Sequence, residues 1–257
     1  MVNIYYVASL PRRQLTIWEP AGGSRCAGEE RGWPSVAWIV VEALLADDSN
    51  WKFTSLMQAL RVPGAEIYYD ENFLAPGDAA QLFDVLLKKC AWKRHKTSFG
   101  SPVPRDEAYY GDPETHYTYS RREYQPLPWL PELLSLKSRV EHATPTAAYA
   151  NLSLPALGYN AVLCNLYRDG NDSVGLHADA EPEMGPVIAS LSLGVTRLFR
   201  LKAKDGTVAF SERLPGGSLL IMAGQTQKYF KHEVPKEARV TQARINLTFR
   251  RIEHSNR

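Results

Sequence analysis

The sequence predicts a mainly β protein of the α+β class, in which two helices precede a β-sandwich or a double-sheet jelly roll. After Pro155, short strand-like runs follow one another without helices between them. Turn residues such as Asp169-Gly170-Asn171, Asp205-Gly206 and Gly216-Gly217 separate these runs. The predicted strands cover residues 161–167, 188–193, 196–201, 208–214, 218–222, 228–234 and 243–251.

The part of the chain before these strands divides in two. Residues 1–62 are predicted to be an N-terminal extension of unknown role, partly loop, with one helix near 36–46. Residues 63–257 are predicted to form one domain, with helices and hairpins in 63–155 and the strand-rich core in 156–252. A helix is expected at 76–89, where apolar residues fall on one stripe after Pro76, and another at 131–139.

Composition sets limits on partners and compartment. The 257 residues carry a net charge of +2, so no global field indicates a nucleic acid or a membrane as the partner. Three distant cysteines argue against a disulfide framework and fit a reducing compartment such as the cytoplasm or nucleus. The apolar run 36–46 is too short to span a bilayer, and no signal peptide is recognised. We therefore expect an intracellular protein without membrane association.

The segment His177-Ala178-Asp179, together with the later His232, has the composition of an open iron(II) site. Side chains at i and i+2 of a strand point to the same face, so His177 and Asp179 can bind one ion. A histidine from a distant strand completes a facial triad and leaves the opposite side open. His-x-Asp also occurs by chance, and a lone later histidine is more often structural, so this prediction needs support from elsewhere in the chain.

The closing strand provides that support. With period 2, one of its faces is polar and the other is apolar. The polar face carries Arg244, Asn246, Thr248 and Arg250. If this face points to solvent it is an ordinary strand edge; if it points inward, the buried guanidiniums need anionic partners. A dicarboxylate beside iron indicates 2-oxoglutarate. Asn165 and Tyr167 share one face of an earlier strand, where they either line the same cavity or pack in the core.

In their order and spacing, these motifs resemble the AlkB family of Fe(II)/2-oxoglutarate-dependent dioxygenases, which are nucleic-acid demethylases. The resemblance covers residues 67–252. It implies a double-stranded β-helix (jelly roll) with flanking helices and an N-terminal nucleotide-recognition region around 103–112. It also implies oxidative demethylation of N-alkylated bases such as 1-methyladenine and 3-methylcytosine in DNA or RNA, with O2 consumed and formaldehyde, succinate and CO2 released.

The resemblance also implies roles for individual residues. Those expected to bind Fe(II), and so to be catalytic, are His177, Asp179 and His232. For 2-oxoglutarate, the expected residues are Asn165, Tyr167, Arg244, Asn246, Thr248 and Arg250. Of these, Arg244 is assigned to the distal carboxylate, with Tyr167 and Asn246, while Arg250 and Asn165 are assigned to the metal-chelating end.

A methyl group on a Watson–Crick edge is hidden in a duplex, so the substrate base must be flipped or unpaired. The resemblance assigns base stacking to Tyr119, a supporting contact to Tyr117 and a base-edge contact to Glu181. Phosphate contacts are expected from basic residues near an aromatic side chain. The candidates are Lys93, Arg94, Lys96 and Arg105. The alternatives are hairpin packing for the tyrosines, a solvated loop acid at 181 and a solvated charged face.

Two departures from the family pattern bear on the substrate. Ala180 replaces a common acidic residue, and no bulky apolar finger is found between Lys96 and Val103 unless Phe99 serves. We therefore expect a preference for single-stranded nucleic acid as the substrate. We also expect the protein to be a monomer. An alternative hypothesis is a 2-oxoglutarate oxygenase acting on a protein, lipid or small molecule. Another is a metal-binding jelly roll without catalytic activity.

Overall fold

A computed structural model describes residues 57–96, 100–119, 122–149 and 158–253. These residues belong to one unit of the chain, Lys52–Arg257. The predicted helix near 36–46, Cys26 and Phe99 lie outside the described residues. The first described strand, β1 (Gln58–Val62), lies on the extension side of the boundary predicted at residue 62, and it pairs with β2 (Ala65–Asp70).

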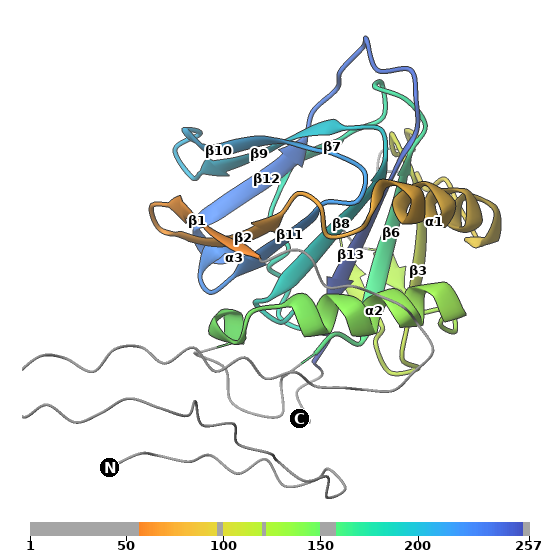
Figure 1. Ribbon diagram of the computed structural model, residues 1–257, viewed down its shortest axis with the longest axis horizontal. Helices are drawn as coiled ribbons and strands as arrows, with labels where there is room; N and C mark the ends of the chain where they lie inside the picture. The colour runs from red at the N-terminus through yellow and green to blue at the C-terminus, as the bar shows by residue number, and fades with distance from the viewer. Residues whose placement is uncertain (1–56, 97–99, 120–121, 150–157, 254–257) are drawn as a thin grey trace, which may run out of the picture. The chain divides into compact units, whose positions relative to one another are not determined.

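Two antiparallel sheets face each other (Figure 1). The larger has the strand order β1-β2-β11-β8-β13-β6-β3, and the smaller has the order β10-β9-β12-β7. Besides β1 and β2, the larger sheet contains β3 (Asp106–Gly111), β6 (Ala161–Tyr167), β8 (Ile188–Gly194), β11 (Leu219–Ala223) and β13 (Arg244–Arg250). The smaller contains β7 (Val174–His177), β9 (Arg197–Ala203), β10 (Val208–Leu214) and β12 (Phe230–Val234).

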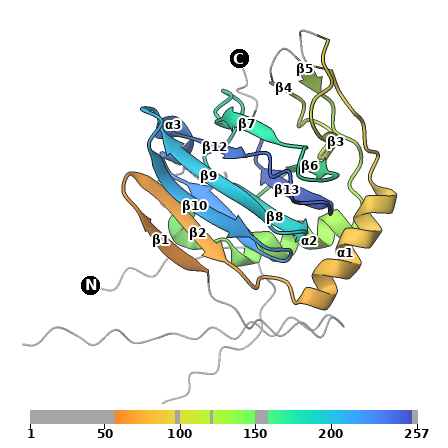
Figure 2. The same cartoon turned by 90° about the horizontal axis from the view of Figure 1, so that it is seen from above.

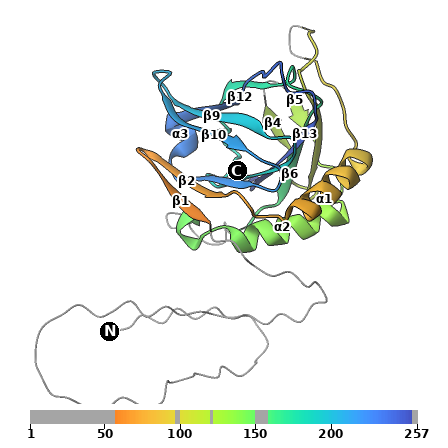
Figure 3. The ribbon, with the colours of Figure 1, turned by 45° about the horizontal axis from the view of Figure 1, so that its top comes forward.

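Two helices cover the outer face of the larger sheet, as Figure 3 shows. In each of α1 (Pro76–Lys89) and α2 (Pro131–Ala143), a proline stands at the start and an acidic residue in the first turn, both favourable there. One apolar cluster joins Leu86 of α1 and Leu133 of α2 to Leu247 of β13. The apolar face of β13 is therefore core, and its polar face turns to the space between the sheets.

The interior between the two sheets is only partly apolar. A second cluster fills one end with residues such as Ile188, Phe199 and Leu220. Toward the hairpin of β4 (Tyr117–Tyr119) and β5 (Arg122–Tyr124), the interior becomes polar. Figure 2 shows this hairpin at the same edge of the fold as α3 (Thr226–Tyr229), with β7 between them.

The observed elements differ from the predicted ones in two places that matter for the site. The run predicted as a strand at 228–234 begins with the helical turn α3, and β12 starts only at Phe230. Strand β7 ends at His177, so Asp179 lies in the following loop rather than on the same strand. The mainly β, α+β class with a jelly-roll arrangement and flanking helices is confirmed. Within the described residues, no helix has the length and apolar character to cross a bilayer.

Candidate active site

The polar face of β13 is buried, which decides between the two interpretations of this strand. Arg244 is 1% exposed and Arg250 is 4% exposed. Strand β13 is paired on both sides, with β6 and with β8, so it is not an edge. Its inward side chains therefore face the pocket between the sheets, where two cations must find partners.

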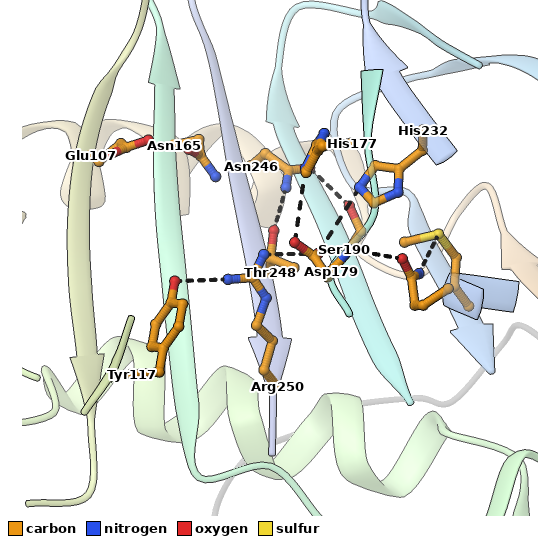
Figure 4. Close-up of polar contacts among 12 residues, drawn as sticks. Glu107, Tyr117, Asn165, His177, Asp179, Ser190, His232, Asn246, Thr248 and Arg250 are labelled. Atoms are coloured by element: carbon orange, nitrogen blue, oxygen red, sulfur yellow. Dashed lines mark hydrogen bonds and ion pairs between the residues drawn. The ribbon is translucent and has the colours of Figure 1, made fainter. Parts of the chain in front are cut away.

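His177, Asp179 and His232 converge at one end of this pocket (Figure 4). One potential ligand atom from each residue can be chosen so that all three lie within 4.8 Å of one another. His177 Nε2 is 3.8 Å from Asp179 Oδ1, and His232 Nε2 is 4.0 Å from Asp179 Oδ2. The cross-strand pair His232–His177 in β12 and β7 brings the two rings together, with centroids 4.3 Å apart. Two imidazoles and one carboxylate fit a facial iron(II) triad.

The hydrogen bond of His177 and the charge state of His232 suit metal binding. The ring atom His177 Nδ1 lies 2.9 Å from the carbonyl oxygen of Gly175, so it donates there, and Nε2 is the atom that faces Asp179 and is available to a metal. Burial, aided by the neighbouring His177, lowers the pKa of His232 to about 3, so this ring is neutral at physiological pH. Neutral imidazole is the form that coordinates a metal.

Asp179 is held as a carboxylate by a buried ion pair. Burial acts to raise the pKa of Asp179, but Arg250 and the two imidazoles outweigh it and lower this pKa to about 2. Arg250 Nη2 donates to Asp179 Oδ2 at 2.8 Å. The backbone N–H of Asp179 donates to Gln227 Oε1 at 3.0 Å, which ties the loop to α3. Asp179 is thus fixed without the support of a strand.

Arg244, at the other end of β13, has no acidic partner among the described side chains. Its Nη2 donates to Ser192 Oγ at 2.9 Å and to Asn246 Oδ1 at 2.7 Å. Its Nε and Nη1 are buried without a hydrogen-bond partner. Burial lowers the pKa of Arg244 to about 10, because the opposing effects of Tyr167 and Glu237 do not offset the lost solvation. A carboxylate of a bound ligand would supply the missing counter-charge and an acceptor for a free nitrogen, since hydrogen bonds between guanidinium and carboxylate are charge-assisted.

Neighbouring side chains orient this guanidinium. Asn246 Oδ1 also accepts a hydrogen bond from Ser190 Oγ, and Asn246 Nδ2 donates to Thr248 Oγ1, both at 2.9 Å. The Tyr167 ring lies under Arg244, with 5.4 Å from its centroid to the guanidinium carbon. Sequence reasoning missed Ser190 and Ser192, although the alternation Ser190-Leu191-Ser192 in an otherwise apolar strand was a signal.

One pocket contains most of the predicted site. The predicted residues that line it are Arg105, Tyr117, Asn165, Tyr167, His177, Asp179, His232, Arg244, Asn246, Thr248 and Arg250. Glu181 lies outside this lining, half-buried, and burial followed by the nearby Asp179 raises its pKa. Its Oε2 atom is buried without a hydrogen-bond partner.

The aromatic hairpin contributes Tyr117 to the pocket wall. Tyr117 is 2% exposed and its hydroxyl accepts a hydrogen bond from Arg250 Nη1 at 3.1 Å. It stacks on Tyr124, which sequence reasoning did not select, at a centroid distance of 5.0 Å. Tyr119 is the last residue of β4, and its side chain lies outside the described part of the chain.

The predicted phosphate contacts are on the surface, apart from Arg105. Lys93, Arg94 and Lys96 are exposed, and Arg94 is engaged by Asp106 at 2.7 Å. Arg105 is largely buried and pairs with Glu107 at 2.6 Å. The pocket and the basic surface are therefore separate groups of residues.

Comparison with known proteins agrees with this geometry. Residues 66–250 match the model of the 2OG-Fe(II) oxygenase superfamily. The chain is 36% identical to "Alpha-ketoglutarate-dependent dioxygenase alkB homolog 3" of Bos taurus over 259 residues, which cover 95% of this chain and 80% of the relative. The chain belongs to the AlkB-like 2OG-Fe(II) oxygenases. The predicted family is thus confirmed, and Fe(II), 2-oxoglutarate and O2, the predicted cofactors, are those of this family.

Other similar proteins match over shorter segments. The homolog 3 of Mus musculus is 42% identical over 196 residues, which are 70% of this chain and 64% of the relative, so less than two thirds of that protein is spanned. "DNA oxidative demethylase ALKBH2" of Bos taurus is 37% identical over 160 residues, which are 58% of this chain and 54% of the relative. The solved structure of OsALKBH1 shares the fold at 20% identity, with a TM-score of 0.52 over 77% of this chain and 100% of that one.

Proposed function

We propose that this AlkB-like oxygenase oxidatively removes methyl groups from N-alkylated bases, such as 1-methyladenine and 3-methylcytosine, in DNA or RNA. The observation that carries the proposal is that one pocket is lined by the three candidate metal ligands and by the buried Arg244, which has nitrogens without a hydrogen-bond partner. The names of its relatives, a DNA oxidative demethylase among them, support a nucleic-acid substrate. When bound, Fe(II), 2-oxoglutarate and O2 supply the oxidation that ends in succinate, CO2 and formaldehyde.

The residues of the chain have binding and orienting roles in this reaction. His177, Asp179 and His232 hold the metal, and Arg250 keeps Asp179 ionised and in place. Arg244 supplies the buried counter-charge for the distal carboxylate of 2-oxoglutarate and has free N–H groups to donate to it. None of these side chains has to act as a nucleophile or a general base, because the cofactors carry the oxidative step.

The base enters from the side of the β4–β5 hairpin. Tyr117 forms part of the wall there, and we assign base stacking to Tyr119 and a base-edge contact to Glu181. The exposed Lys93 and Lys96, with Arg94, contact the phosphate backbone. We infer a preference for single strands, because an unpaired base needs no wedge to leave a duplex.

The deciding experiment uses the full chain with Fe(II), 2-oxoglutarate and oligonucleotides that carry 1-methyladenine or 3-methylcytosine. The oligonucleotides are supplied as DNA and RNA, single- and double-stranded. We expect loss of one methylene mass per lesion in mass spectra, with formaldehyde and succinate released in equal amounts. The His232→Ala variant is the control and should leave every oligonucleotide unchanged.

Two results would contradict the proposal. Succinate release without demethylation of any oligonucleotide would favour a protein, lipid or small molecule as the substrate. Absence of succinate under all conditions would favour a binding module without catalytic activity.

A further inference from the structure

A buried carboxylate that no predicted role uses lies beside the pocket, on β3. Glu107 is 2% exposed, and both of its oxygens are engaged by pocket-lining residues. Its Oε1 forms an ion pair with Arg105 Nη2 at 2.6 Å, without hydrogen-bond geometry, and its Oε2 accepts a hydrogen bond from the Tyr124 hydroxyl at 2.9 Å. Burying a carboxylate is costly unless such partners compensate it. The network therefore holds three side chains in one arrangement.

Arg105, which Glu107 holds in place, also contacts Asn165. Its Nε donates to Asn165 Oδ1 at 2.8 Å. A guanidinium has no acceptor, so the amide must turn its oxygen to Arg105 and its NH2 group elsewhere. In Figure 4 the Asn165 nitrogen points away from Glu107, toward the side of Thr248 and Arg250. Arg105 thus determines which end of the Asn165 amide faces the pocket.

The pairing of β3 with β6 fixes the position of Glu107 relative to Asn165. Glu107 and Asn165 are directly opposite each other in the β3–β6 register. Tyr124 brings the β4–β5 hairpin into the same network through its hydroxyl group. Its ring stacks on Tyr117, whose hydroxyl group is bonded by Arg250, the partner of Asp179. The hairpin is therefore connected to both sides of the pocket.

We infer that Glu107 is a positioning residue for 2-oxoglutarate. It clamps Arg105, so that the Asn165 amide presents its NH2 group to the cofactor, and through Tyr124 it links the hairpin to the same site. This inference rests on the proposed function in one respect, the assignment of Asn165 to 2-oxoglutarate. It extends that function to Glu107 and Tyr124, which touch neither metal nor cofactor in this scheme.

The test measures binding rather than turnover. The full chain is loaded with Mn(II), and 2-oxoglutarate is titrated into it in a calorimeter. The Glu107→Gln variant keeps the shape of the side chain but removes the charge that holds Arg105. We expect its dissociation constant for 2-oxoglutarate to rise about tenfold, the lower end of the range for residues that orient ligands. The thermal unfolding midpoint of each variant, measured without ligand, shows whether it folds.

A matched pair of tyrosine variants separates positioning from general packing. Tyr124→Phe removes only the hydroxyl that bonds Glu107, and we expect about a threefold loss of affinity, the scale of one hydrogen bond. Tyr109→Phe is the control, because its hydroxyl donates to the Thr115 carbonyl while its ring packs against Tyr117 and Tyr124. It should leave the affinity unchanged. Equal losses in the two variants would overturn the inference.

A double-mutant cycle provides the sharpest test. If Glu107 acts through Asn165, Glu107→Gln should cause no further loss of affinity in an Asn165→Ala background. An undiminished further loss there, or unchanged affinity in Glu107→Gln alone while Asn165→Ala is weakened, would overturn the inference and leave the proposed function standing. Unchanged affinity in Asn165→Ala would overturn both this inference and the assignment of Asn165 in the proposed function.

Discussion

The two arginines at the ends of β13 lie on the same buried face, yet their surroundings are opposite. Arg250 has a carboxylate partner within the protein, Asp179, and this partner outweighs burial and raises the pKa of the guanidinium above its ordinary value. Arg244 Nη2 donates to Ser192 and Asn246, which are uncharged acceptors, and burial lowers the pKa of this guanidinium to about 10. One cation is neutralised by the fold, and the other is left to be neutralised by a ligand.

This difference indicates that the two ends of the pocket have different roles. At the end near Arg250, the ion pair fixes the position of a metal-binding oxygen, while Arg250 Nε and His232 Nδ1 are buried without a hydrogen-bond partner. The end near Arg244 carries an unfavourable buried charge that a dicarboxylate would relieve. We expect stability to depend on the first end and cofactor affinity on the second.

Removing Asp179 should have the largest effect, because it takes away a metal ligand and the partner of Arg250 together. We expect Asp179→Ala to lose measurable turnover and about 3–5 kcal/mol of unfolding free energy, the cost of leaving a buried charge unpaired. Turnover is followed by succinate release, and stability by denaturant unfolding. The exposed Asp84 of α1 serves as the control, since Asp84→Ala should leave turnover unchanged and alter stability little. An active Asp179→Ala enzyme would remove the metal assignment.

Changing Arg250 should reproduce the stability loss and reveal its origin. Arg250→Met leaves Asp179 buried and unpaired, so we expect a loss of about 3–5 kcal/mol in unfolding free energy. In the double variant Asp179→Ala with Arg250→Met neither charge remains, and most of this stability should return. If the losses of the two single variants simply add in the double variant, the ion pair is not the reason for them.

Arg244 should behave in the opposite way. Arg244→Met removes a cation without a counter-charge, so the unfolding free energy of the ligand-free protein should stay the same or rise. The 2-oxoglutarate concentration for half-maximal turnover should increase about 10- to 100-fold, as expected for a charged hydrogen bond of about 1.5–3 kcal/mol. Excess 2-oxoglutarate with Mn(II) should raise the unfolding midpoint of the wild type more than that of the variant. An unchanged requirement for 2-oxoglutarate would contradict the anchor role.

The exposed cluster should show the smallest effect. Lys93→Glu combined with Lys96→Glu should weaken the binding of a single-stranded oligonucleotide and reduce the slope of log K against log salt by about 0.7 for each lost phosphate contact. Arg94→Ala should do less, because Asp106 already engages this side chain. Fluorescence anisotropy at several salt concentrations provides the measurement. Equal slopes in wild type and variant would argue against phosphate contact by these lysines.

The fold was largely predictable where the local pattern and the tertiary structure agree. The bounds of α1, β6 and β10 match the predicted ranges, since Pro76 opens the helix and turn residues delimit the strands. The helical turn α3 was missed because four residues, Thr226–Tyr229, carry no helical periodicity. Strand β7 is absent from the predicted strands. The argument for His177 and Asp179 assumed an extended segment, whereas β7 ends at His177 and contacts with Arg250 and Gln227 hold Asp179 in a loop.

The candidate site was predictable from residue types at fixed spacing, but not its supporting contacts. The polar face of β13 and the His-x-Asp segment could be recognised in the sequence. Whether that face points inward depends on its pairing with β6 and β8, which no local pattern specifies. The contacts of Glu107 with Tyr124 and of Asp179 with Gln227 join distant segments through the folded structure. Single-sequence reasoning could not find them.

The central position of β13 also limits how this chain can change during evolution. With hydrogen-bonded neighbours on both sides, a one-residue insertion or deletion that shifted its register would exchange the two faces of the strand. Arg244 and Arg250 would then press against α1 and α2, while Ile245 and Phe249 would fill the cofactor pocket. We therefore expect tolerated length variation to collect in the turns, such as Asp205-Gly206, and homologous chains to keep this strand free of gaps.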